Sequence, residues 1–180
     1  MKKYYIIIFT FLVIIQLEAQ DKFFTKEGHI SFFSHSLVED IKANNNQVLS
    51  IIDTKTGKIA IQLLMRSFQF KKALMQEHFN ENYIESHKYP KATFSGEIKN
   101  FNQLDDEFSE TEIVGILKIR GKEKEVSTKT SVKISNDKII ISGNFIVEVA
   151  DFGIKIPAIV RNNIAKTIKV SFELYHKPYN

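Results

Sequence analysis

The 180-residue chain is mildly basic and has no cysteine, with 25 Lys and Arg against 21 Asp and Glu and a formal net charge of +4. The lack of cysteine excludes disulfides, a thiol nucleophile, thiolate metal sites and a lipid-modified cysteine anchor. Basic and acidic residues are interleaved, as in Lys122-Glu123-Lys124-Glu125, so no basic stripe is present to follow a phosphate backbone. Nucleic acid is therefore not an expected partner.

The first twenty residues have the pattern of a secretory signal peptide. Lys2 and Lys3 precede an apolar run from residue 4 to 15, and the small residue Ala19 follows. The run is shorter than the roughly twenty residues that a membrane-spanning helix needs. We predict that residues 1–20 are a signal peptide and that the mature protein begins near Gln20 or Asp21. The protein is then exported, either to the periplasm or out of the cell.

The remaining residues, 21–180, form a single predicted domain. Without Lys2, Lys3 and Glu18 the chain keeps 23 basic and 20 acidic residues, so its net charge is +3. About 160 residues suit one domain with a substantial core, and no linker rich in Pro, Gly or Ser divides them.

The N-terminal third reads as strands. Residues 22–34 form a strand with bulky side chains on both faces, residues 37–41 are ambiguous, and Asn44-Asn45-Asn46 is typical of a turn. Two apolar runs, 48–52 and 59–65, flank a turn-forming cluster that ends in Gly57, which predicts a hairpin.

A short helix interrupts the strands. Met75, Phe79 and Tyr83 recur at the spacing of one helical face, which predicts one apolar stripe. Pro90 cannot lie in a helix interior and favours an extended Tyr89, so the helix must end before Tyr89. Residues 92–99 then alternate between apolar and polar, as in a strand with one apolar face.

The C-terminal half alternates regularly. A solvated loop at 101–111 precedes predicted strands, and Gly121-Lys122 and Asn136-Asp137 mark turns between them. These strands cover residues 113–119, 126–134, 138–149 and 168–174.

Together the patterns predict an all-β, antiparallel fold of seven to eight strands with one short amphipathic helix. A sheet with a single apolar face must close on itself or pack on a second sheet, because an open edge invites aggregation. We favour a closed β-barrel of about eight strands over a sandwich. The inner rows are aliphatic and aromatic, so the interior is apolar.

Three motifs in this order resemble those of the YceI-like family. Residues 88–94 (KYPKATF) are similar to the family's "yP-x-a-tF" strand entry, residues 115–126 (GILKIRGKEKEV) to its "G-x-L-t-i-x-G-v-t-k-x-V" hairpin, and residues 151–154 (DFGI) to its "dFgi" segment. The resemblance covers nearly the whole mature chain.

The resemblance implies an exported, lipocalin-like barrel that binds a polyisoprenoid or a similar long-chain amphiphile. Family members often carry a His-Leu-Arg run in the helix, where this chain has His78-Phe79-Asn80. A contact between that arginine and a polar head group therefore does not carry over.

Apolar residues on the inner rows are the candidate ligand contacts. In a barrel of about eight strands they either fill a core or line a slender tunnel, and the pattern alone leaves both open. The candidates are Phe32, Ile61, Leu63, Met65, Phe68, Phe70, Met75, Phe79, Tyr83, Phe94, Phe145, Val147, Phe152 and Phe172.

The sequence does not favour catalysis or a metal site. His78 and His87 are nine residues apart, whereas two ligands on one helical face need a spacing of four. No Gly-x-Ser-x-Gly elbow and no Gly-x-Gly-x-x-Gly run occurs. We expect no enzyme activity, no metal and no cofactor other than a bound polyisoprenoid, isoprenoid quinone, fatty-acid derivative or other lipid.

The residues and the resemblance together leave two candidate functions. One is a carrier or sequestering protein for a long apolar ligand, in transient contact with a membrane. The other is a filled barrel or sandwich that acts as a protein-interaction module in the cell envelope. The oligomeric state stays open, a dimer included.

Overall fold

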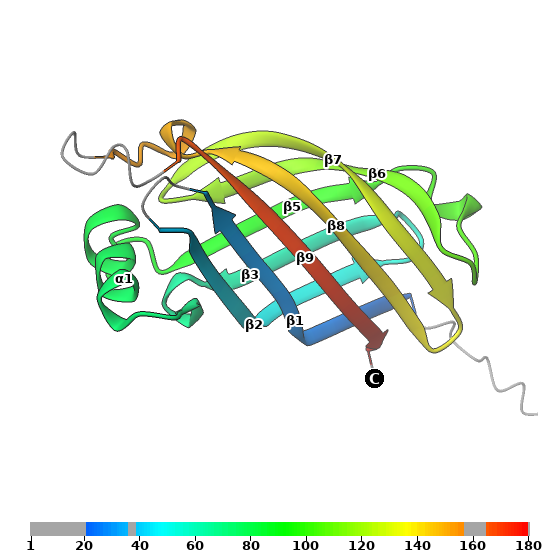
Figure 1. Ribbon diagram of the computed structural model, residues 1–180. Helices are drawn as coiled ribbons and strands as arrows, with labels where there is room; N and C mark the ends of the chain where they lie inside the picture. The colour runs from blue at the N-terminus through cyan, green and yellow to red at the C-terminus, as the bar shows by residue number, and fades with distance from the viewer. Residues whose placement is uncertain (1–20, 36–38, 157–164, 180) are drawn as a thin grey trace, which may run out of the picture.

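The structure is a computed structural model that describes residues 21–35, 39–156 and 165–179, and these residues form one antiparallel β-barrel (Figure 1). Eight strands close in the order β1-β9-β8-β7-β6-β5-β3-β2, since β1 pairs with both β9 and β2, and β4 is added beside β2. The strands are β1 (Lys22–Ser34), β2 (Ile41–Asp53), β3 (Lys58–Leu64), β4 (Gln69–Phe70), β5 (Lys91–Ile98), β6 (Ser109–Ile119), β7 (Lys122–Ser135), β8 (Lys138–Glu148) and β9 (Thr167–Pro178). The predicted closed barrel of about eight strands is confirmed.

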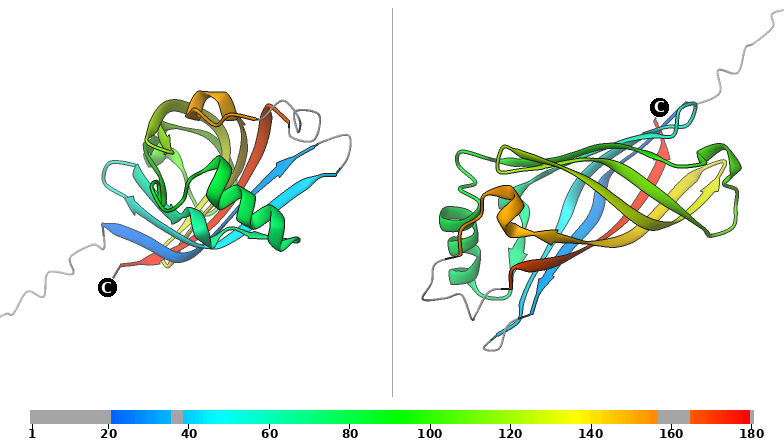
Figure 2. Two further views of the ribbon diagram at one scale, coloured as in Figure 1. Left: turned by 90° about the vertical axis from the view of Figure 1, so that its left-hand side faces the viewer. Right: turned by 90° about the horizontal axis from the view of Figure 1, so that it is seen from above.

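Helical segments gather at one end of the barrel, which we call the capped end. The α-helix α1 (Ala73–His78) runs without a break into the π-helical turn η2 (Phe79–Tyr83), and together they form the cap that lies across this end (Figure 2). The 3₁₀ turn η4 (Val149–Phe152) follows β8 at the same end. The helix was predicted from its apolar stripe. The π-helical turn was not, because its widened hydrogen bonding has no sequence signature.

Two shorter 3₁₀ turns complete the described structure. The turn η1 (Met65–Ser67) follows β3, and η3 (Phe101–Gln103) follows β5. The loop predicted for residues 101–111 is shorter than expected, because β6 already begins at Ser109 and pairs with Val132 of β7. The signal-peptide prediction concerns residues 1–20, which lie outside the described residues.

The turn predicted at Asn44-Asn45-Asn46 is wrong, because β2 runs through it. Asn45 is fully buried, and its side-chain amide donates to the Leu64 carbonyl over 3.1 Å and accepts from the Gln47 amide over 2.9 Å. These bonds satisfy backbone groups beyond the point where the β2–β3 ladder ends, at Val48 and Leu63. An asparagine-rich stretch is therefore kept extended by tertiary hydrogen bonds that override its turn preference.

Fully buried aliphatic side chains fill the barrel at the end opposite the cap, which we call the packed end. Ile52, Ile139, Ile141 and Leu174 come from three strands and have no exposed surface. Such close packing leaves little space for a ligand in this half. The interpretation of the interior as a filled core is therefore right for the packed end.

One histidine is buried in this core. His176 on β9 has 0% exposure, and its Nε2 lies 2.8 Å from the Ser50 hydroxyl and its Nδ1 3.3 Å from the Ile139 carbonyl. A carbonyl only accepts, so Nδ1 carries the proton and Nε2 accepts from Ser50 in a neutral ring. Burial lowers the pKa of His176 to about 4.

His176 should make the protein less stable in mild acid. The unfolded chain binds a proton near pH 6.5 and the folded chain only near pH 4, so His176 contributes its full stabilisation above pH 6.5 and loses it as the pH falls towards 4. The loss should approach roughly 3 kcal/mol. Urea melts at several pH values measure it, and His176→Gln should flatten this part of the profile whereas His87→Gln, at an exposed site, should not. An unchanged slope in His176→Gln would contradict the assignment.

Candidate functional site

An apolar cavity of about 390 Å³ occupies the half of the barrel next to the cap. Its wall is built from the inner rows of the strands, and the cap closes it from outside. All fourteen residues predicted as ligand contacts line this cavity, namely Phe32, Ile61, Leu63, Met65, Phe68, Phe70, Met75, Phe79, Tyr83, Phe94, Phe145, Val147, Phe152 and Phe172. The structure thus brings the predicted set together around one space, while ligand binding by these residues stays a prediction.

Four phenylalanines hold the cap over the cavity. The Phe79 ring of the cap lies 5.5 Å from that of Phe32, 5.0 Å from that of Phe70 and 5.8 Å from that of Phe68, measured between ring centroids. Such edge and tilted contacts add to the apolar burial of the rings. The cap is therefore fastened at one point by a cluster from β1, β4 and the segment between η1 and β4.

The rest of the cap is loosely packed. Neither α1 nor η2 contains a buried residue, and Met75 and Tyr83, which face the cavity, are only half-buried. Leu74 on the outer face of the cap is 61% exposed. Burial raises the pKa of the Tyr83 phenol, so this hydroxyl stays protonated in neutral solution. The cap covers the cavity without forming a core of its own.

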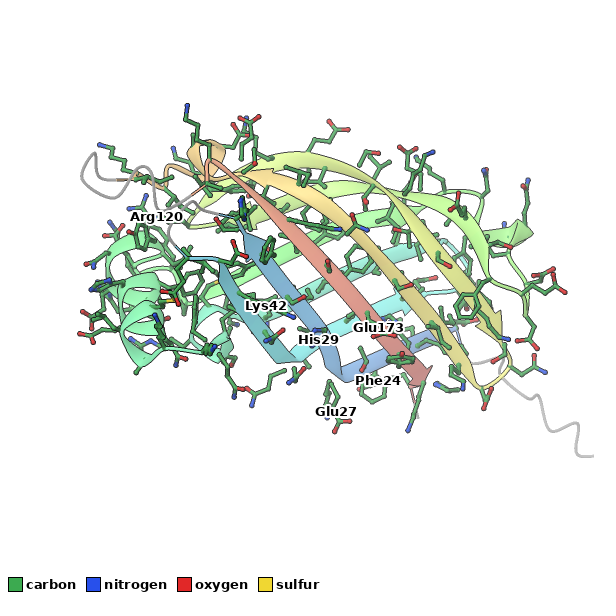
Figure 3. The ribbon with its side chains drawn as sticks, in the orientation of Figure 1. Phe24, Glu27, His29, Lys42, Arg120 and Glu173 are labelled. Carbon is green, nitrogen blue, oxygen red and sulfur yellow. The ribbon has the colours of Figure 1, made fainter. Side chains whose placement is uncertain are left out.

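A partly buried arginine links the segment after the cap to the barrel wall on the side of η4. Arg120, in the turn between β6 and β7, forms an ion pair with Glu85 just after η2 and donates from Nη1 to the Gly153 carbonyl over 2.7 Å. Its guanidinium also lies over the Tyr89 ring, 5.7 Å from the centroid. Figure 3 shows Arg120 at the end of the barrel that carries α1.

The backbone has a positive φ angle at Arg120 and at both residues that its guanidinium contacts. Glu85, Arg120 and Gly153 have φ angles of 53°, 50° and 66°, a left-handed region that residues other than glycine rarely adopt. Sequence reasoning placed Arg120 only within the hairpin motif of residues 115–126, because three segments far apart in the chain must meet before its role is visible.

Other lining residues escaped the predicted list although the same alternation marks them. Ile113, Leu117 and Ile119 on β6, and Ile168 and Val170 on β9, lie on inner rows and line the cavity. Polar residues line it as well, and no sequence signal placed them there. They are Ser34, Glu39, His78, Thr93 and Thr128.

The chemistry of the cavity wall is mainly apolar. Among the residues that the structure describes, no three His, Asp or Glu side chains are grouped so that they could hold a metal ion. The cavity wall carries mainly aliphatic and aromatic side chains with a few hydroxyl groups. Such a surface favours long apolar molecules.

Comparison with known proteins assigns the family. The family model described as "YceI-like domain" matches residues 22–175. The chain belongs to the YceI-like family. None of the curated proteins compared matches the sequence.

Solved structures share the fold at low sequence identity. A polyisoprenoid-binding domain from Saccharophagus degradans superposes with a TM-score of 0.76 at 15% identity, over 89% of this chain and 99% of that one. BcnA of Burkholderia cenocepacia gives a TM-score of 0.69 at 16% identity, over 82% of this chain and 95% of that one. The YceI protein of Campylobacter jejuni gives 0.63 at 16% identity, over 81% and 90%.

This YceI-like barrel and the three solved structures share one fold. At 15–16% identity they show the fold and not the ligand. Within the described part of the chain, no helix is long and apolar enough to span a membrane.

Removing the Arg120 guanidinium should loosen the segment that follows the cap. We choose Arg120→Asn, because asparagine tolerates the left-handed backbone and the turn is kept. A lost charge-assisted contact at a half-buried site is worth about 1 kcal/mol, so exchange of the Ser86 and Tyr89 amides should speed up roughly fivefold.

Hydrogen exchange read by mass spectrometry measures this change. The control is Lys118→Asn on the same hairpin, whose exposed pair with Glu123 spans 2.8 Å. Equal exchange in the two variants would contradict the role assigned to Arg120.

Proposed function

We propose that this YceI-like protein carries or sequesters a long-chain apolar or amphiphilic molecule inside its barrel, as a binding protein without enzyme activity. The single observation behind the proposal is the cavity of about 390 Å³ lined by aliphatic and aromatic side chains. Its volume lies within the range of small-molecule pockets, roughly 300–1,000 Å³. A polyisoprenoid, an isoprenoid quinone or a fatty-acid derivative has the chemistry to fill it.

The comparison with the S. degradans structure supports the class of ligand. That protein is described as a polyisoprenoid-binding domain, and it aligns over 99% of its length with this chain. The half-buried Phe79 and Met75 of the cap support the proposal from this chain itself, since a ligand would cover apolar surface that now lies next to open space.

The alternative is a protein-interaction module with a filled barrel. The packed end agrees with that interpretation, but the hollow half does not, because an interaction module has no need of an apolar cavity. The hollow half therefore favours the carrier. Export by the predicted signal peptide would place such a carrier in the cell envelope or outside the cell, where apolar molecules need a carrier to cross water.

Extraction of the purified protein tests the proposal directly. The protein is extracted with organic solvent, and mass spectrometry identifies what is released. One lipid or isoprenoid per chain is the expected result. If native protein and protein refolded with a mixture of isoprenoids and fatty acids both yield no lipid, the carrier proposal is wrong.

Phe145 distinguishes a ligand-lined wall from a filled core. Its ring borders the cavity, 6.3 Å from the Phe172 ring between centroids, and it is half-buried. Phe145→Ala enlarges an existing space, so the lipid-free protein should lose only about 1–2 kcal/mol while lipid affinity falls. Ile141→Ala is the matched control on the same inner row, at a fully buried site, and should cost about 2–5 kcal/mol.

Denaturant melts with and without lipid measure both quantities. A loss of roughly 3–5 kcal/mol for lipid-free Phe145→Ala, with no effect of lipid, would indicate a filled core at this position.

A further inference from the structure

The barrel wall is incomplete between β7 and β8. Their ladder runs from the Ser135–Lys138 pair to the Thr130–Gly143 pair and ends there. Both strands continue towards the capped end, where residues 122–129 pair only with β6 and residues 144–148 pair only with β9. Over this stretch two neighbouring strands of a closed barrel run on without backbone pairing to each other.

Side chains frame the unpaired stretch into a window. At its base the Thr128 hydroxyl donates to the Asn144 carbonyl over 2.8 Å. At its upper edge η4 crosses from β8 to β7, where Lys124 and Asp151 form an ion pair with 3.1 Å between Nζ and Oδ1. We call the unpaired stretch between residues 122–127 and 145–148 the β7–β8 window, and in the right-hand view of Figure 2 the ribbons of the two strands diverge towards the capped end.

The cavity reaches the window from inside. Val126 and Thr128 on one side and Phe145 and Val147 on the other all line it. Of these inner-row residues, Val126, Thr128 and Phe145 are only half-buried, whereas Val132 further along β7 is fully buried. Val126, Phe145 and Val147 pack in one apolar cluster with Phe152 of η4, so side-chain packing rather than a backbone ladder closes the wall here.

The surroundings of the window also suit the passage of an apolar chain. Ile146 points outward beside it and is 61% exposed. Thr130, where the ladder ends, has a buried hydroxyl oxygen with no hydrogen-bond partner among the described residues. A buried polar group without a partner costs free energy, and this cost falls at the base of the window.

The cap is held by the ring contacts of Phe79 and, just after η2, by the pair between Glu85 and Arg120. Widening the window breaks no backbone ladder, and its polar ties within the described residues are the Thr128–Asn144 bond, the exposed Lys124–Asp151 pair and the bond from Arg120 Nη1 to the Gly153 carbonyl. An exposed ion pair contributes little to stability.

We propose that an apolar ligand enters and leaves the cavity sideways through the β7–β8 window while the cap stays in place. The inference rests on the proposed function. It adds the route by which the ligand enters and leaves, and it gives the divergence of β7 and β8 a role in ligand exchange.

Bridging the window tests the route, and a chain without cysteine makes the experiment clean. Ser127→Cys with Ile146→Cys places two outward thiols on opposite sides of the window, and a short bis-maleimide joins them. In the matched control, Ser127→Cys with Val114→Cys joins the same β7 position to its paired neighbour on β6. A third pair, Glu39→Cys with Lys72→Cys, ties the start of the cap to the barrel, where these side chains form an ion pair over 2.6 Å.

The probe is parinaric acid, a fluorescent polyene fatty acid, and the rate is its transfer from protein to an excess of phosphatidylcholine vesicles. Each bridged protein is compared with the same cysteine pair blocked by N-ethylmaleimide, which separates bridging from the substitutions themselves. Bridging the window should slow transfer roughly tenfold or more, as expected when a gating motion is blocked, and the other two bridges should change it less than about twofold.

The outcomes distinguish the proposed route through the window from the proposed carrier function. If parinaric acid binds but only the cap bridge slows its transfer, or if the window bridge acts no more than the β6–β7 bridge, the window is not the route and the carrier proposal stands. If the unbridged protein and wild type take up no parinaric acid, while the extraction experiment also yields no lipid, both claims are wrong.

Discussion

Closure of the sheet through β1 is the constraint on which the rest of the structure depends. This strand pairs with β2 from Lys22 to Ser34 and with β9 on its other side, so the sheet closes on itself. Register is irregular on both sides near Gly28, whose missing side chain leaves room for Leu174, since a Cβ there would lie 2.5 Å from its Cδ2 atom. Because side chains alternate strictly along a strand, this closure decides which row of every strand faces inward.

Closure also divides the interior along the barrel axis. At the packed end the inner rows meet across the barrel and bury Ile52, Ile139 and Leu174 completely. Towards the cap, β3 ends at Leu64 and the β7–β8 ladder ends at Thr130 and Gly143, so the walls spread. Aromatic rings and a loosely packed helix then cover a space that the inner rows no longer fill.

Much of this was accessible from the sequence, because alternation is a local property of each strand. Phe145 and Val147 belong to one row of β8, and their place on the cavity follows once the sheet is closed. Closure itself was inferred from the single apolar face of the predicted sheet and from the aggregation that an open edge invites, with a sandwich as the alternative. The helix from Met75 to Tyr83 was likewise visible as one stripe at helical spacing.

What escaped prediction depends on contacts between distant segments. Asn45 stays in a strand because Leu64 supplies a partner, and no local pattern contains that information. Arg120 meets Glu85 and Gly153 only in the folded chain. The choice between a filled core and a lined tunnel was posed for the whole interior, whereas the answer differs from one end to the other, because it depends on where each ladder stops.

This division separates stability from ligand preference. Ile52 and Ile139 are fully buried at the packed end, away from the cavity, while half-buried side chains such as Phe145 border the cavity. Substitutions around the cavity can therefore reshape it at a small cost in folding free energy, whereas similar changes at the packed end remove contacts that hold the barrel together. A barrel built this way can change the shape of its cavity over many sequence changes and keep its fold, which makes the hollow half the natural place to engineer new binding.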